Sequence, residues 1–409
     1  MEELLFLAHR IPYPPNKGDK IRSYHMLKEL AQSYRVHLGA FVDNPDDRRY
    51  QNKLEALCES VFLPDLHPLR ARVRSLSGLL RGDALSVPYY YDRRMQEWID
   101  SLLARSNLRR VFVFSSPMAQ YVMNIQGRSI SRIMDFVDVD SDKWRQYAER
   151  KPWFTKWVFS REGMQLLRYE KVIADKFDAS VFVSADEAAL FQRLAPEVSA
   201  RVKVIDNGVD YEYFSPERDY EDPYAGNKAV LVFTGAMDYW ANIDAVKWFA
   251  RDVFPRIREA VKNAQFFIVG SRPTDDVLRM GEIPGVIVTG SVVDTRPYLA
   301  HAQAAIAPLR VARGVQNKVL EAMAMAVPVL GTSAAMEGLV CDDQAGLQIA
   351  DDEQQFSDLA VKLLQQDDLQ PMQGSRQWVC QHHDWSINSK KMYELFESFH
   401  GQLEKQTQR

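Results

Sequence analysis

Short apolar runs alternate with polar turns and helical patterns through the first half of the chain. The runs that we predict as β-strands are Leu4–Ala8, Val36–Phe41, Val61–Leu63, Arg110–Phe114, Ser131–Phe136 and Ala179–Val183. Ser23–Gln32, which follows the first strand, has the spacing of a helix. Because strands that alternate with helices form parallel sheets, this pattern predicts an α/β domain with helices on both faces of the sheet.

A second series of the same kind follows the polar segment Glu217–Lys228, which has the composition of a link between domains. A short apolar strand and the turn signal Asn207-Gly208 precede that link. The predicted strands of the second series are Ala229–Thr234, Gln265–Val269, Val286–Thr289, Ala304–Ala307 and Val327–Leu330. Apolar residues at helical spacing from Trp385 to about Leu403 predict a final helix.

A chain of 409 residues is too long for one ordinary core. We therefore expect domains at 1–212 and 213–384, and the final helix at 385–409. The content of 46% hydrophobic and 26% charged residues is typical of a soluble globular protein. A net charge of −4 argues against nucleic acid as a partner, and three widely spaced cysteines argue against a disulfide framework.

Neither a signal peptide nor a membrane span is visible in the sequence. His9 and Arg10 end the apolar run Leu4–Ala8, which therefore looks like a strand. No apolar run approaches the roughly 20 residues that span a bilayer. We expect a cytoplasmic protein, and peripheral contact with a membrane stays open.

The stretch Arg313–Pro328 combines a glycine-containing loop with a short amphipathic helix that begins near Asn317. A helix N-terminus attracts anions, and Arg313 and Lys318 add two positive charges beside it. Glu321 cannot bind phosphate but suits a ribose diol. These features favour a nucleotide-sugar diphosphate site, and the alternative is a helix that only packs against a sheet.

Three glycines of the second series, Gly235, Gly270 and Gly290, follow or end successive predicted strands. Glycine allows a backbone to approach a ligand closely, so their repeated position favours a nucleotide site. In the first series, Gly18 lies among Lys17, Lys20 and Arg22 in the segment Pro12–Tyr24. That segment suits a phosphate or an acidic acceptor, and an ordinary solvated loop is the alternative.

Four aspartates follow the predicted strand Ser131–Phe136, in the segment MDFVDVDSDKW: Asp135, Asp138, Asp140 and Asp142. Their spacing allows three interpretations, namely a divalent cation, an aspartate that orients a sugar or acceptor, and a cap on the next helix. No second carboxylate cluster is evident, so we expect no metal and no other cofactor.

Aromatic and basic residues are interleaved at two places in the first series. One run contains Trp153, Phe154, Trp157, Phe159, Lys151, Lys156, Arg161 and Arg168, and the other contains Arg70, Arg72, Arg74 and Arg81. Such runs can dock on an anionic membrane surface. The alternative is a helix whose aromatic side chains belong to the core.

Several of these segments together resemble the GT-B glycosyltransferases of the large family 4, which are usually retaining enzymes. The matching segments are VIDNGVDYEYFSP, FTGAMDYWANIDAV, VTGSVVDTRPYLAHAQAAIAPL, NKVLEAMAMAVPVL and the final helix. The segments MDFVDVDSDKW and ARGVQNKVLEAMAM are similar to the sugar transferases associated with PEP-CTERM/exosortase exopolysaccharide clusters. The resemblance covers essentially the whole chain.

This resemblance implies two Rossmann-like domains that face a cleft, with the final helix crossing back to pack on the first domain. The second domain would hold the nucleotide sugar and the first would present the acceptor. Glu321 would bind the donor ribose, Lys318 the diphosphate, and the loop after Gly290 the base. The full set of expected donor-binding residues is Gly18, Gly235, Gly290, Arg313, Asn317, Lys318 and Glu321.

The sequence departs from the family at three positions. Arg313 stands where the family often has a glutamate that contacts the sugar, and the loop after Gly235 lacks the usual Arg and Lys. Arg313 could supply the charge that this loop lacks. Ala326 stands where glycine is common, which would cost about 1 kcal/mol if the backbone there has a positive φ.

The sequence thus predicts a hexosyltransferase that moves a sugar from a nucleoside diphosphate to a glycan or polyprenyl-linked acceptor. Lys318 and Arg313 would stabilise the leaving diphosphate, while Asp138 or Asp140 would position the reacting hydroxyls. The alternatives are a nucleotide-sugar epimerase of the same fold and a non-catalytic nucleotide-sugar-binding protein.

Overall fold

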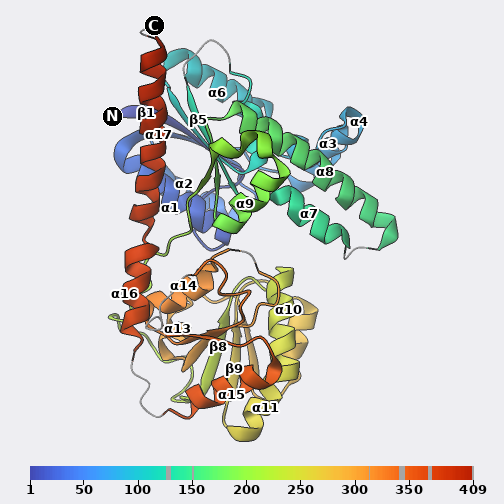
Figure 1. Ribbon diagram of the computed structural model, residues 1–409, viewed down its shortest axis with the longest axis vertical. Coiled ribbons are helices and arrows are strands. Elements are labelled where there is room, and N and C mark those ends of the chain that lie inside the picture. Colours follow the sequence, from blue (N-terminus) through green and yellow to red (C-terminus); the bar gives the residue numbers. More distant parts are fainter. Residues whose placement is uncertain (126–129, 150–151, 313, 340–345, 367–370, 408–409) are drawn as a thin grey trace. The chain divides into compact units, whose positions relative to one another are not determined.

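The computed structural model describes the chain except for residues 126–129, 150–151, 313, 340–345, 367–370 and 408–409. The chain divides into two compact units. Unit 1 contains Met1–Asp206 and Asn388–Arg409, and unit 2 contains Asn207–Ile387. Each unit has one parallel sheet with helices around it (Figure 1). The predicted α/β class with two parallel-sheet domains is confirmed.

In unit 1, the described strands form one sheet in the order β3-β2-β1-β4-β5-β6-β7. Their bounds are β1 Glu2–Ala8, β2 Tyr34–Ala40, β3 Ser60–Phe62, β4 Arg110–Phe114, β5 Ser131–Val137, β6 Ala179–Phe182 and β7 Val202–Val204. The central strands are buried on both faces, which explains the unbroken apolar run Leu4–Ala8 in β1. The strand order reverses between β1 and β4, and ligands of such sheets bind beyond the carboxyl ends at that point.

The helices of unit 1 connect and flank these strands. They are α1 Gly18–Ser33, η1 Pro45–Tyr50, α2 Gln51–Glu55, α3 Pro68–Ser75, α4 Ser77–Arg81, α5 Ser86–Tyr89, α6 Arg93–Arg105, η2 Ser116–Tyr121, α7 Asp140–Glu149, α8 Trp153–Lys176, α9 Ala185–Leu194 and η3 Pro196–Arg201. The helix α8 can approach α7 closely because Gly163 has no side chain. A Cβ atom there would lie 2.9 Å from the carbonyl oxygen of Ser141.

In unit 2, the described strands form a sheet in the order β10-β9-β8-β11-β12-β13. Their bounds are β8 Val230–Thr234, β9 Gln265–Val269, β10 Val286–Gly290, β11 Ala304–Ala307, β12 Val329–Gly331 and β13 Leu347–Ile349. The strand β13 was not predicted, and it is short with only partly buried or exposed residues. The order reverses between β8 and β11, which locates the expected ligand position of this sheet.

The helices of unit 2 pack around a core rich in aromatic side chains. They are α10 Trp240–Trp248, the π-helical turn η4 Phe249–Val253, α11 Phe254–Ala260, α12 Asp275–Leu278, η5 Arg279–Glu282, α13 Arg296–His301, α14 Asn317–Ala324, α15 Glu353–Leu364 and α16 Gln373–His382. In that core, Phe249 contacts the rings of Phe266 and Phe356 at centroid distances of 4.7 and 5.5 Å.

The predicted final helix is confirmed as α17, Trp385–Thr407. Its residues from Asn388 onward belong to unit 1. There, Glu397 accepts hydrogen bonds from Tyr34 (3.2 Å) and Arg110 (3.0 Å). The fully buried Arg110 guanidinium also pairs with Glu2 at 2.6 Å, so residues near both ends of the chain contact one side chain.

Candidate functional site

The predicted donor segment of unit 2 lies at the point where the strand order reverses. Gly235 directly follows β8, and the loop after β11 leads into α14, which begins at Asn317 as predicted. The Asn317 side chain accepts a hydrogen bond from the Asn207 amide at 3.2 Å. The side chain of Gln316, the N-cap residue of α14, makes no capping hydrogen bond, and the backbone N–H groups of a first helical turn suit an anion.

Lys318 connects α14 to the loop after β8. Its Nζ donates a hydrogen bond to Asn242 Oδ1 at 2.6 Å, and Asn242 Nδ2 donates to the carbonyl of Ala236 at 2.9 Å. The same Nζ lies 4.0 Å from the centroid of the Phe233 ring. These contacts fix the ammonium at the end of β8, in front of the backbone of Gly235.

Because glycines stand at the ends of β8, β9 and β10 in unit 2, backbone atoms and not side chains form the surface at these strand ends. A Cβ atom on Gly235 would lie 3.2 Å from Lys318 Nζ and 2.8 Å from Asn242 Nδ2. A Cβ atom on Gly270 would lie 1.6 Å from the carbonyl oxygen of Gly235, so no side chain fits there. Gly290 ends β10 with a φ of +70° and has open space around it, so its loop can present backbone groups to a ligand.

The charged side chains of α14 are partly buried. Burial lowers the pKa of the Lys318 ammonium to about 7, although the charge of Glu321 acts to raise it. Burial raises the pKa of the Glu321 carboxyl to about 7, although Lys318 acts to lower it. Within the described part of the chain, the Glu321 carboxyl makes no hydrogen bond or ion pair. A half-buried cation and an unpaired carboxyl on neighbouring turns suit a ligand that brings both an anion and hydroxyl donors.

In unit 1, the segment around Gly18 differs from the prediction. Gly18 is the first residue of α1, and the cations that follow it are not available to a ligand. Lys20 is buried and pairs with Asp47 at 2.5 Å, while Arg22 is buried and binds both carboxylate oxygens of Asp135, at 2.8 and 3.2 Å. The interpretation of Lys20 and Arg22 as a phosphate site was wrong because both charges neutralise buried carboxylates.

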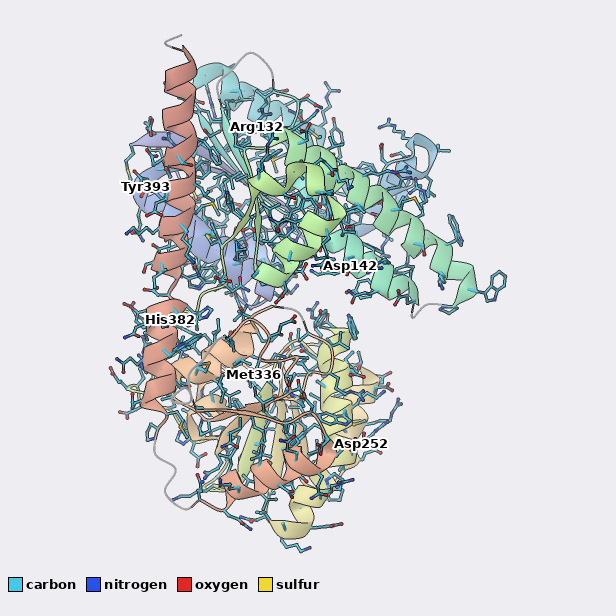
Figure 2. The ribbon with its side chains drawn as sticks, in the orientation of Figure 1. Arg132, Asp142, Asp252, Met336, His382 and Tyr393 are labelled. Atoms are coloured by element: carbon cyan, nitrogen blue, oxygen red, sulfur yellow. The ribbon has the colours of Figure 1, made fainter. Side chains whose placement is uncertain are left out.

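The predicted acceptor residues Asp138 and Asp140 lie between β5 and the first turn of α7. Both accept from Lys143, at 2.6 and 3.3 Å, so this cation holds the two carboxylates together. Asp142, labelled in Figure 2, is buried and pairs with Arg145 at 2.6 Å. Over the described residues, no group of three or more His, Cys, Asp or Glu side chains could hold a metal ion.

The N-terminus of α7 is capped from other helices. Glu187 of α9 accepts from the Val139 backbone N–H at 2.7 Å. Glu170 of α8 accepts from the backbone N–H and the hydroxyl of Ser141, at 3.1 and 2.6 Å. These buried carboxyls take the capping role that the aspartates of the segment were thought able to play.

A polar cluster beyond the carboxyl end of β1 was missed by the sequence reasoning. Asp19 pairs with His9 at 3.3 Å and with Arg10 at 2.9 Å, and Arg10 also lies 3.4 Å from Asp43. Burial acts to raise the pKa of Asp19, but His9 and Arg10 outweigh it and hold the pKa well below its ordinary value. His9 Nδ1 is buried without a hydrogen-bond partner in the described structure.

The sequence contained a signal for this cluster. His9 directly follows the first predicted strand, and the carboxyl ends of parallel strands are where ligands bind. Arg313, the residue that departs from the family pattern, lies outside the described residues, and so does Lys151.

Two Rossmann-like parallel-sheet units define the chain as a protein with the GT-B fold. Residues 228–366, which contain β8 to α15, match the family model described as glycosyl transferases group 1. No curated protein matches the chain at a significant level. Among the described helices, none combines the length and apolar character needed to cross a membrane.

Solved structures resemble the whole chain at low sequence identity. Anabaena Alr3699/HepE in complex with UDP and glucose has a TM-score of 0.65 and 14% identity, over 97% of this chain and 100% of that one. Sucrose-phosphate synthase from Thermosynechococcus elongatus has a TM-score of 0.63 and 14% identity, over 98% and 100%. A glycosyltransferase from Rickettsia africae has a TM-score of 0.62 and 12% identity, over 97% and 98%. At such identities the likeness concerns the fold alone.

Proposed function

We propose that the protein is a glycosyltransferase that moves a sugar from a nucleoside-diphosphate sugar to a glycan acceptor. The observation that carries this proposal is the arrangement of Lys318 and Glu321 on α14, in front of the Gly235 backbone. This arrangement lies inside the segment that matches the glycosyl transferases group 1 model, and the fold is one that glycosyltransferases use.

Each donor-binding group has a proposed role. Lys318 and the N-terminus of α14, which starts at Asn317, bind the diphosphate, and Glu321 accepts hydrogen bonds from the ribose hydroxyls. The Gly235 backbone lies against the diphosphate, and the loop after Gly290 contacts the base. Arg313 serves the diphosphate in this proposal, as its place in the sequence suggests. Uridine nucleotides are the first to test, because the HepE structures contain UDP or UDP-glucose.

The proposed reaction breaks the bond between the sugar anomeric carbon and the diphosphate oxygen. The acceptor oxygen forms a bond to the same carbon from the same face, and its proton passes to the leaving diphosphate. Positive charge around that diphosphate supplies the main electrostatic stabilisation, so we propose a metal-independent reaction with retention. Asp138 or Asp140 positions the reacting hydroxyls in unit 1. We also assign substrate binding to the segment between β1 and α1, which begins at His9 and leads into Gly18, the first residue of α1.

The acceptor that we propose is a lipid-linked glycan in exopolysaccharide or cell-surface glycan synthesis. This rests on the resemblance of two sequence segments to PEP-CTERM/exosortase-associated sugar transferases. A polyprenyl-linked acceptor would require a cytoplasmic enzyme to work at the membrane face. Domains with the predicted limits would then close on both substrates and exclude water, which otherwise hydrolyses the donor.

Incubation of the pure protein with labelled nucleotide sugars and a membrane lipid extract tests the proposal. Label in the lipid fraction is the expected result. An isomerised nucleotide sugar without acceptor would instead support the epimerase, and binding without turnover would support a non-catalytic protein.

The assignment of Lys318 has its own test. Lys318→Ala should lower turnover by about 100-fold or more, because a charge that stabilises the leaving group is lost. The matched control is Lys362→Ala, which removes an exposed lysine of unit 2 and should leave turnover unchanged. Both variants should melt as the parent does, and undiminished activity of Lys318→Ala would exclude the diphosphate role.

A further inference from the structure

An apolar stripe faces solvent along α3 and α4. Leu76 joins these two helices with helical backbone angles, φ −61° and ψ −24°, so the stripe is continuous. Its members recur at intervals of four, three and four residues, the spacing of one helix face, and they are Leu69, Val73, Leu76 and Leu80. More than half of each side chain is exposed, and Leu80 is 92% exposed.

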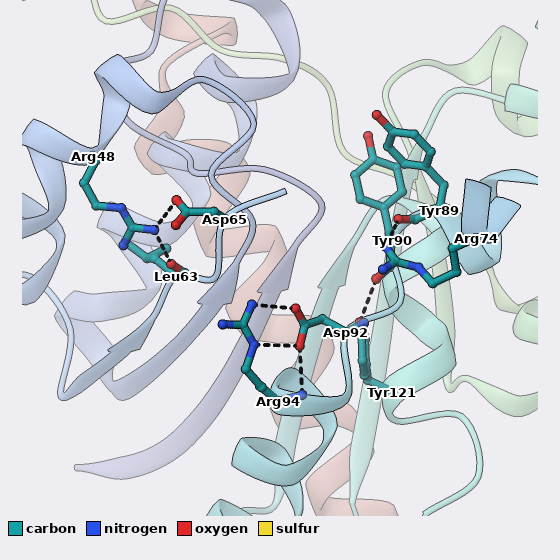
Figure 3. A network of polar contacts seen from close by, with 9 residues as sticks. All are labelled: Arg48, Leu63, Asp65, Arg74, Tyr89, Tyr90, Asp92, Arg94 and Tyr121. Carbon is teal, nitrogen blue, oxygen red and sulfur yellow. Dashed lines mark hydrogen bonds and ion pairs between the residues drawn. The ribbon is translucent and has the colours of Figure 1, made fainter. Parts of the chain in front are cut away.

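The opposite face of the same helices is the one that contacts the protein. Ala71 and Gly78 are buried on that face. Arg74 also points inward, where its guanidinium donates to the carbonyl of Pro88 at 2.6 Å. It also donates to the carbonyl of Tyr89 at 2.6 Å (Figure 3). Small residues and Arg74 therefore pack these helices against the rest of unit 1, and the apolar face does not take part in this packing.

The N-terminal half of α8 also exposes large apolar side chains. Trp153 is 86% exposed, and Trp157 and Met164 are more than half exposed. They lie at positions i, i+4 and i+11, on one face of the helix. Trp153 and Trp157 are not core residues, which removes the alternative that the sequence left open for them.

Direct contacts make α8 and the α3–α5 segment one body. Arg161 of α8 donates to the carbonyls of Gly78 and Asp83, at 2.9 and 3.1 Å. The buried Glu162 accepts from the backbone N–H groups of Leu85 and Ser86, at 2.6 and 3.0 Å. Figure 1 shows α3 and α4 beside α8 on the side of unit 1 away from α17.

The charged residues within α3, α4 and the first turns of α8 are all basic, and the exposed Asp83 borders them. Residues 68–82 and 152–161 contain no Asp or Glu. Arg70, Arg72 and Arg81 are exposed on α3 and α4, and Lys156 is exposed on α8. Over the described residues, none of these four cations makes a hydrogen bond or an ion pair. The surface thus offers cations, aliphatic side chains and tryptophan to one partner.

We propose that this surface, formed by α3, α4 and the first half of α8, docks on an anionic lipid bilayer. The aliphatic stripe enters the boundary between headgroups and acyl chains, and the tryptophans lie at headgroup depth. The four cations contact lipid phosphates, for which their charge is complementary. Docking on the bilayer would bring the enzyme to a lipid-linked acceptor, and to that extent the inference rests on the proposed function.

Vesicle sedimentation tests the docking without any donor or acceptor. The protein should sediment with vesicles containing about one third phosphatidylglycerol and not with pure phosphatidylcholine vesicles, since each arginine near an anionic surface strengthens binding roughly fivefold. The variants Leu76→Ser with Leu80→Ser, and Arg70→Gln with Arg72→Gln and Arg81→Gln, should each lose at least tenfold in vesicle affinity.

Matched controls are available on unit 2. Leu278→Ser removes a leucine that is half exposed, and Arg251→Gln removes an exposed arginine. Both should bind vesicles as the parent does. Tryptophan fluorescence should shift to the blue with anionic vesicles, and Trp153→Phe with Trp157→Phe should remove most of that shift.

Three results would overturn the inference: no sedimentation with anionic vesicles, equal loss in the unit 2 controls, or self-association through the stripe in place of lipid binding. The last is detected as a dimer that the Leu76→Ser, Leu80→Ser variant converts to a monomer. Transfer of label to a soluble acceptor in the absence of vesicle binding would overturn only this inference. Vesicle binding without nucleotide-sugar turnover would contradict only the proposed function.

Discussion

At the scale of single residues, the environment of Lys318 and Glu321 decides how α14 can bind a donor. Burial favours the neutral form of both side chains, so both pKa values lie at about 7. A diphosphate favours the protonated lysine, and ribose hydroxyls favour the ionised glutamate. Donor binding should therefore favour the charged forms of both Lys318 and Glu321. The protein should then exchange protons with the solvent, in a direction that depends on pH.

Nucleotide-sugar binding should release protons at about pH 6 and take up protons at about pH 8. Below pH 7 the Glu321 carboxyl must lose its proton to bind the ribose, and above pH 7 Lys318 must gain one to bind the diphosphate. Calorimetry in buffers of different ionisation enthalpy measures both quantities. Glu321→Gln should abolish the release and Lys318→Met the uptake. The same sign of proton transfer at both pH values would contradict these roles.

Ala326 is a second residue whose environment matters, because its backbone conformation affects the free energy of unfolding. It has a φ of 55°, so the condition for the cost expected at this position is met. The backbone N–H of Ala326 donates to Met323 O and that of Val327 donates to Ala322 O, which is the bonding of a helix end that favours glycine.

Ala326→Gly should raise the free energy of unfolding by about 1 kcal/mol, because glycine adopts this conformation without strain. Urea unfolding followed by fluorescence measures the change. The control is Ala322→Gly, inside α14, which should lose about 1 kcal/mol or more. Equal effects of the two substitutions would show that the backbone angle does not determine the result.

At the scale of elements, the contact between α7 and α8 depends on a buried carboxyl. Burial raises the pKa of Glu170 to about 8, although its hydrogen bonds with Ser141 act to lower it. In the unfolded chain the same group ionises near its ordinary value. Its contribution to stability is therefore present at low pH and is lost as the pH rises from about 4.5 through about 8.

Glu170→Gln should flatten this part of the pH dependence. The free energy of unfolding of the parent should fall between about pH 5 and pH 8 by more than that of the variant, because only the parent titrates there. Urea unfolding at the two pH values gives the comparison. As a control, Glu149→Gln at the end of α7 should keep the slope of the parent. Parallel curves for the parent and Glu170→Gln would mean that Glu170 is ionised in the folded protein.

At the scale of the whole molecule, unit 1 depends on both ends of the chain. The fully buried Arg110 is bound by Glu2 from β1 and by Glu397 from α17. Phe396 and Met392 of α17 are also buried. The last helix is therefore a structural part of a unit that begins at the first residue.

Glu397→Ala should lower the free energy of unfolding by about 1–2 kcal/mol, because it leaves a buried guanidinium with fewer partners. Thermal and urea unfolding measure the loss. Glu394→Ala, an exposed position one turn earlier, should change stability by less than about 0.5 kcal/mol. Similar small effects of both substitutions would show that Arg110 is satisfied by Glu2 alone.

Apolar periodicity determined the elements of this protein. The strands Arg110–Phe114, Gln265–Val269 and Ala304–Ala307 have the predicted bounds, because strands buried on both faces are rich in apolar residues. The short, half-exposed strand Leu347–Ile349 carried no such signal. Local sequence also located α14 and its Lys318–Glu321 pair, since residues three apart on a helix are neighbours by geometry.

Only the tertiary structure decided what each charge contacts. Lys20 and Arg22 look like ligand-binding cations in the sequence, but their partners Asp47 and Asp135 come from distant segments and bury them. Trp153 and Trp157 look suited to a core or to a membrane surface, and it is the packing of α8 that exposes them. Periodicity is a local property of the chain, whereas burial and ion pairing depend on segments that meet only in the folded protein.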